Sequence, residues 1–99
     1  MYRALRLCSQ GGAFEAIPDL PRIVDLAQLR ASLETAGIPV LDARVLLIAS
    51  LPPEVTVTRA GRLLFKTGDE QVARRAFERL MEFRAIAEAP AAPSPRTTR

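Results

Sequence analysis

The sequence predicts an α+β domain: a small, mostly antiparallel sheet of β-hairpins with two α-helices packed on one face. Three observations carry this prediction. Valine and threonine alternate over residues 55–58, which is the period of a β-strand. Leucines recur at helical spacing at Leu26, Leu29 and Leu33. A second helical pattern, over residues 70–84, follows the alternating segment closely, so strands and helices are interspersed along the chain.

The N-terminal region predicts a short hairpin. Residues 2–8 and 13–17 have strand-like composition, and the Ser-Gln-Gly-Gly segment at 9–12 suits a turn because glycine tolerates positive φ. Pro18 and Pro21 then interrupt regular structure. We therefore expect two strands followed by an irregular connection.

The first helix has defined ends in the sequence. Asp25 is a suitable N-cap, and the helical pattern continues to Ala36. Gly37 stands where a left-handed C-cap belongs, and Pro39 prevents continuation. The sequence therefore predicts a helix over about 26–36.

The segment 40–51 leaves two interpretations open. The continuous apolar run from Val45 to Ala49 suits a buried strand, whereas Leu41 and Ile48 also fit a helical stripe. Its β-branched content favours the strand. Two prolines directly after the segment end the element in either interpretation.

The second hairpin can be predicted with its register. A three-residue loop ending at Gly61 pairs Val57 with Leu63 and Val55 with Phe65, so all four apolar side chains share one face. Gly61 then takes the left-handed position of a type I turn with a bulge. A two-residue turn would put the two apolar pairs on opposite faces. The outward face of this hairpin carries Thr56, Thr58, Arg62, Leu64 and Lys66.

The second helix is predicted to begin at a capping box, with Thr67 as the cap and Glu70 three residues later, and to run to about Arg84. Glu70 and Arg74 form a favourable i,i+4 pair. The predicted inner stripe consists of Val72, Ala73, Ala76, Phe77 and Leu80. The C-terminal residues are rich in alanine and proline. We therefore predict one α+β domain over 1–85 and a disordered Ala/Pro-rich tail over 86–99.

The composition argues against most catalytic machinery. The 99 residues contain no His and one Cys, so Ser-His-Asp or Cys-His catalysis and ordinary zinc sites have no ligand set. No apolar run approaches the ~18 residues of a membrane span. The single Cys8 has no partner for an internal disulfide, which fits a reducing, cytoplasmic setting. We therefore expect a cytoplasmic, non-enzymatic protein without cofactor, metal or membrane contact.

An enzyme based on carboxylate and arginine chemistry remains the second alternative. Asp42 stands among apolar residues, where a pocket would shift its pKa, although it also suits the cap of a helix beginning there. Cys8 has no histidine to activate it, so a buried thiol is favoured. Glu78 and Glu82 share a helix face among arginines, which is typical of a solvated surface rather than a metal site.

The function predicted from these observations is a small protein-interaction or self-associating module, with a protein partner or a second copy as its target. Its apolar surplus is hard to bury in so short a chain and is typical of an interface. That surplus consists of Leu46, Leu47, Leu51, Leu64, Met81 and Phe83. The predicted interaction surface consists of Arg62, Leu64, Lys66, Met81 and Phe83.

Nucleic-acid binding is the first alternative to this function. The net charge is +3, and Arg59, Arg62 and Lys66 would give the second hairpin a basic face. RNA-binding sheets combine such charge with exposed aromatic side chains, and this chain has four Phe and one Tyr. None of the five is expected on that face, so nucleic acid is a possible but not a favoured partner.

Overall fold

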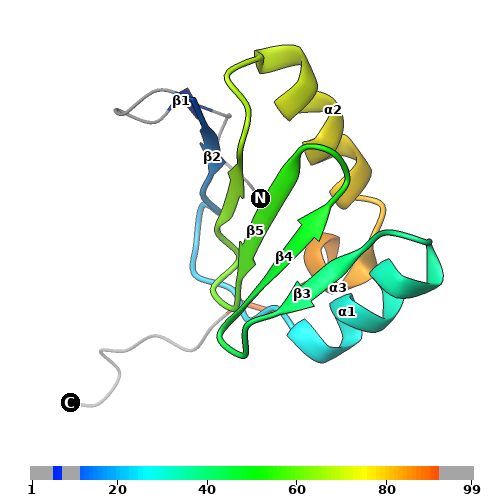
Figure 1. The fold of residues 1–99 in the computed structure, drawn as a ribbon. Coiled ribbons are helices and arrows are strands. Elements are labelled where there is room, and N and C mark those ends of the chain that lie inside the picture. Colours follow the sequence, from blue (N-terminus) through cyan, green and yellow to red (C-terminus); the bar gives the residue numbers. More distant parts are fainter. Residues whose placement is uncertain (1–5, 8–11, 92–99) are drawn as a thin grey trace.

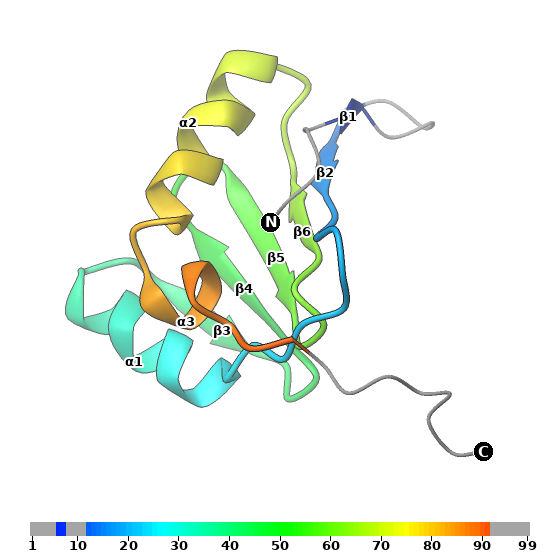
Figure 2. The same cartoon turned by 180° about the vertical axis from the view of Figure 1, so that it is seen from behind.

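The computed structural model describes residues 6, 7 and 12–91. It contains a six-stranded antiparallel sheet of order β1-β2-β6-β5-β4-β3, so the predicted α+β class is confirmed. Helices cover one face of the sheet and leave the other open (Figures 1 and 2). The strands are β1 (Arg6–Leu7), β2 (Phe14–Ala16), β3 (Val40–Asp42), β4 (Leu46–Ser50), β5 (Glu54–Thr58) and β6 (Leu63–Phe65). The helices are α1 (Leu26–Thr35), α2 (Glu70–Leu80) and α3 (Arg84–Ala87).

The core lies between the sheet and the helices. Every second residue of the central strands turns toward the helices and is almost fully buried, because the side chains of a strand alternate between its faces. The sheet contributes Phe14, Ala16, Leu47, Ala49, Val55, Val57, Leu63 and Phe65. The helices contribute chiefly Leu29, Leu33, Ala73, Ala76, Leu80 and Ile86. This layer fixes which sheet residues point outward, and those form the surface discussed below.

The predicted register of the β5–β6 hairpin is confirmed. Val55 pairs with Phe65 and Val57 with Leu63, and all four side chains are fully buried. Gly61 has a φ of +95°, the left-handed conformation that the three-residue loop requires. The apolar pattern is therefore consistent with this register, since a slip of one residue would have turned the two apolar side chains of one strand away from the core.

The segment 40–51 forms strands, as its β-branched content favours. It makes the β3–β4 hairpin, in which Leu47 and Ala49 turn into the core. Asp42 caps no helix, because its side-chain Oδ1 instead accepts a hydrogen bond from the Arg44 amide at 2.8 Å. Arg44 has a φ of +74° in the tight turn that follows, so the chain reverses there.

The predicted α1 is confirmed at both ends. The Asp25 side chain accepts a hydrogen bond from the Gln28 amide at 3.0 Å and so caps the helix. Ala36 ends the helix, and Gly37 follows with a φ of +79°. Both caps depend on residues within a few positions of the helix ends, so the sequence alone could predict them.

Two predictions for the second helix are wrong. Its cap is Asp69, whose Oδ1 accepts from the Gln71 amide at 2.9 Å, whereas Thr67 Oγ1 accepts from the Asp69 amide at 3.1 Å. Thr67 thus closes a turn before the helix, and the carboxylate takes the capping position. The helix also ends at Leu80 rather than Arg84, because the Phe83 amide bonds to the Leu80 carbonyl and tightens the last turn.

The C-terminal segment packs on the body through α3 and the residues after it. Ile86 is fully buried and Ala89 is 6% exposed. Arg22 donates from Nη1 to the Ala89 carbonyl at 2.9 Å, and the Ile23 amide donates to the Pro90 carbonyl at 2.9 Å. These contacts connect residues 89–90 to the connection between β2 and α1 (Figure 2).

The boundary predicted after residue 85 therefore lies too early. Residues 86–91 belong to the packed body, although their Ala/Pro composition is typical of a disordered segment. The rest of the predicted tail, 92–99, lies outside the described residues. Residues 2–5 and 8–11 of the predicted N-terminal hairpin also lie outside them, whereas its strands β1 and β2 are described and pair with each other.

Candidate interaction surface

The five residues predicted to form one interaction surface lie on opposite sides of the sheet. Arg62, Leu64 and Lys66 alternate along β6 and its flanks and point away from the core. Met81 and Phe83 lie in the helical layer and pack against the core while partly buried. The predicted surface is therefore wrong as a single patch, because the sheet separates its two halves.

The outward face of the sheet carries a continuous row of paired side chains. Leu41 on β3 pairs with Ile48 on β4, Ile48 with Thr56 on β5, and Thr56 with Leu64 on β6. Cross-strand neighbours on one face lie within contact distance, so these four side chains adjoin one another. Leu41 is 62% exposed and the other three are half-buried. We call this set the open-face row. Figure 1 looks onto the face of the sheet that carries it, with the helices behind.

A charged pair ends the open-face row. Leu64 pairs across the strands with Glu15 on β2, whose side chain is 10% exposed. Arg62 donates to Glu15 Oε2 from Nη2 at 2.7 Å and from Nε at 3.0 Å. Arg62 therefore neutralises a nearly buried carboxylate, and its charge is no longer free for a partner.

The apolar surplus predicted from the sequence is largely absorbed. Leu47 is buried, and the other members of that set are half-buried. The large apolar side chains that the structure exposes are Leu20, Ile23, Leu41 and Val45. Leu41 and Val45 lie at the β3–β4 turn, near the β3 edge of the sheet, whereas Leu20 and Ile23 lie in the connection between β2 and α1. None of the four lies on α2.

The β3 edge also carries a small ion-pair cluster. Arg30 on α1 donates to Glu34 Oε2 from Nε at 3.2 Å and to Asp42 Oδ2 from Nη1 at 3.1 Å. The hydrogen bond and charge of Glu34, and then the charge of Asp42, raise the pKa of Arg30. Asp42 is thus an exposed residue that connects β3 to α1 through Arg30. It does not lie among buried apolar residues, where the sequence-based enzyme hypothesis expected it.

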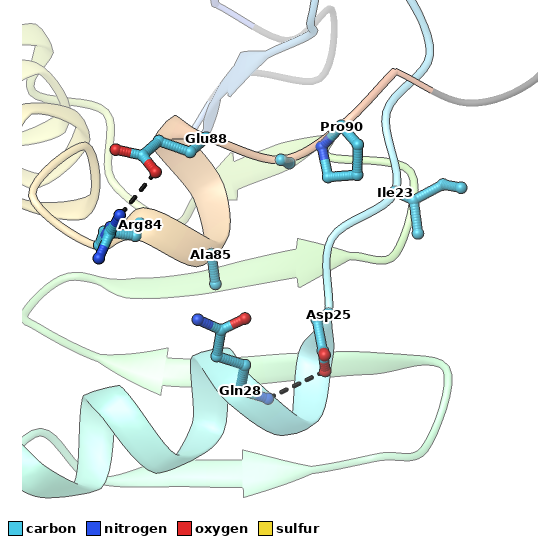
Figure 3. A pocket seen from close by; sticks show the side chains of 8 residues that line it. Ile23, Asp25, Gln28, Arg84, Ala85, Glu88 and Pro90 are labelled. Carbon is cyan, nitrogen blue, oxygen red and sulfur yellow. Dashed lines mark hydrogen bonds and ion pairs between the residues drawn. The ribbon is translucent and has the colours of Figure 1, made fainter.

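A cavity of about 590 Å³ lies between the start of α1 and α3 (Figure 3). Its charged side chains already have partners. Asp25 caps α1, and Arg84 Nε donates to Glu88 Oε1 at 3.2 Å. Cys8 lies outside the described residues.

Sequence reasoning missed Leu41 and Ile48 as surface residues. The signal was present, because a strand with Leu47 and Ala49 inward must turn Ile48 outward. This alternation could not be applied because the sequence left both a strand and a helix as interpretations of the segment 40–51. Leu64 was placed correctly because its strand had an unambiguous register.

Among residues 6–7 and 12–91, no group of three or more His, Cys, Asp or Glu side chains is arranged to hold a metal ion. No helix in this part of the chain is long and apolar enough to cross a bilayer. Comparisons with protein-family models, curated proteins and solved structures give no match. The function is therefore argued from the geometry of the surface.

Proposed function

We propose that the protein is a non-enzymatic interaction module that binds another polypeptide through the open face of its sheet. The observation that carries this proposal is the open-face row, in which Leu41 adjoins Ile48 and Thr56 lies between Ile48 and Leu64. No helix of the described residues covers them (Figures 1 and 2). An apolar sheet face left in water is typical of a binding surface.

The charges around the row indicate the chemistry of the partner. Arg59 lies at the turn end of the β5–β6 hairpin and Lys66 at the other end, and both are exposed. Neither forms an ion pair within the described residues, whereas Arg62 is bound to Glu15. Exposed Glu54 lies across the strands from Lys66, so that end carries both signs of charge and the Arg59 end is basic. A polypeptide segment with apolar side chains and an acidic residue near Arg59 would match this surface.

A nucleic acid is supported less well by the same surface. Of the three basic residues in that alternative, Arg62 is already paired with a carboxylate. The four phenylalanines lie on the core side of the sheet, so within residues 12–91 the open face offers no aromatic ring for stacking a base. Binding would then rest on Arg59 and Lys66 alone.

Site-specific photo-crosslinking in cells tests the proposal. A photoreactive amino acid replaces Thr56, in the middle of the open-face row, and the matched control replaces Glu78, which is exposed on α2. We expect a discrete protein adduct from position 56 and none from position 78. An adduct removed by nuclease would identify nucleic acid instead. Equal, diffuse labelling from both positions would overturn the proposal.

A further inference from the structure

Within the described residues no strand pairs with the outer edge of β3, and the register of its backbone groups is defined by β4. In the strand order β3 is terminal, with β4 as its neighbour. The Ser50 amide donates to the Pro39 carbonyl at 2.9 Å, and the Ala43 amide donates to the Leu46 carbonyl at 3.0 Å. In an antiparallel ladder every second residue of a strand directs its amide and carbonyl toward the same neighbour. Leu41 lies midway between Pro39 and Ala43, so its backbone groups also point toward β4.

The residues on either side of Leu41 must then point the other way. The amides and carbonyls of Val40 and Asp42 face outward from the sheet, where an added strand would receive them. Because Val40 and Asp42 are two residues apart, two copies of this edge can pair antiparallel with each other. The backbone of Val40 in each copy then bonds to the backbone of Asp42 in the other. The pairing places a twofold axis at Leu41.

From these groups we propose that two copies of the chain pair β3 against β3 about a twofold axis at Leu41, forming one continuous sheet. The surface involved is the sheet edge rather than its open face, so this inference stands apart from the proposed function. Leu41, 62% exposed in the single chain, would be covered by its own counterpart. The two open-face rows would then join into one apolar surface spanning both copies.

Charge complementarity favours a second copy over a different strand. In this register Arg44 lies opposite Ile38 of the second copy, directly after the C-terminal turn of α1. That turn holds Glu34 and the negative end of the helix dipole. Arg44 has no ion-pair partner within the described residues, and pairing would bring its charge near this helix end, where Glu34 already binds Arg30 of its own copy.

The side of α1 next to this edge can accommodate a second copy. Arg30 reaches Asp42 from α1, which identifies that side, and Glu34 shares it. Ala27 and Ala31 occupy the same helix face and are exposed. Small side chains there let two α1 helices lie close together, with Arg30 of one near Glu34 of the other.

Two measurements on the purified full chain test the inference. Sedimentation should give a dimer mass for the natural chain, and Leu41→Lys should weaken the dimer by at least about tenfold, since it sets like charges face to face at the axis. Val45→Lys is the matched control, because Val45 is 67% exposed but outside the paired strand, and it should remain dimeric. Mixing Leu41→Lys with Leu41→Glu should restore the dimer.

A disulfide tests the register independently of dimer strength. Residues on the axis would form a non-bonded antiparallel pair with Cα atoms ~4.5 Å apart, within disulfide range. Oxidised Leu41→Cys should therefore form a disulfide between the two introduced thiols, identified by peptide mapping, and Val45→Cys should not. A monomeric natural chain, or equal crosslinking of both variants, would overturn the inference. Specific crosslinking at position 56 in that case would still support the proposed function.

Discussion

Arg62 donates two hydrogen bonds, at 2.7 and 3.0 Å, to one carboxylate oxygen of Glu15, although 47 residues separate them in the chain. The pair joins β2 to β6 on the outward face of the sheet. Glu15 is nearly buried while Arg62 is more than half exposed, so solvent screens the pair only in part. This contact holds the N-terminal side of the sheet in register with its centre.

Arg62→Met should therefore destabilise the fold by about 1–2 kcal/mol, since it keeps much of the side chain's length but removes two hydrogen bonds from a nearly buried carboxylate. Denaturant unfolding of Arg62→Met, Glu15→Gln and the double variant measures the coupling. We expect a coupling free energy of about 0.5–1.5 kcal/mol. Purely additive effects would show that the pair contributes no stability.

Gly61→Val should cost about 1–2 kcal/mol, because a β-branched residue is strained at the φ of +95° found there. Ala60→Ser, one residue earlier in the same loop, is the control and should leave stability nearly unchanged. Thermal unfolding of both variants gives the comparison. Similar small effects at both positions would be inconsistent with the observed turn.

Asp69→Ala should lower the free energy of unfolding by about 1 kcal/mol, since it removes the side-chain acceptor of the first α2 amides. Thr67→Ala should cost less, because Thr67 only closes the preceding turn. The two substitutions distinguish the observed cap from the capping box predicted from the sequence. A larger loss for Thr67→Ala would favour that box.

A chain ending at Ile86 should melt several degrees below a chain ending at Ala91. The shorter chain loses buried Ala89 and the carbonyl that Arg22 binds. Ile86→Ala in the full chain should cost about 2–4 kcal/mol, as expected for a fully buried isoleucine. Calorimetry on the three proteins provides the test, and equal melting temperatures for the two truncated chains would show that residues 87–91 contribute nothing.

The sequence predicted elements whose signals are local. The α1 caps at Asp25 and Gly37 and the β5–β6 register follow from neighbouring residues, and the structure confirms them. The 40–51 segment was ambiguous because a short apolar run fits a strand or a helix equally well. Pairing with β5 decides it, and that pairing is a tertiary contact.

The sequence failed where packing overrides composition. Ala-rich residues after Ala85 have no periodic pattern, yet Ile86 finds a place in the core that only the assembled helices create. The predicted interaction surface failed for a related reason. Met81 and Phe83 were grouped with Leu64 by apolar character alone. The predicted packing of the helices on the buried face of the sheet already separates them from outward Leu64, and the structure shows them against the core.

The most direct test of the open-face binding surface is photo-crosslinking from position 56 in a Leu64→Lys background. Leu64 pairs with Glu15, so lysine there meets a carboxylate, whereas Leu64→Glu would set two carboxylates opposite each other. We expect Leu64→Lys to change stability by less than about 1 kcal/mol and to abolish the adduct. Leu20→Lys, at a more exposed leucine off the sheet (65%), should retain the adduct. An undiminished adduct from a folded Leu64→Lys protein would contradict binding through the open face.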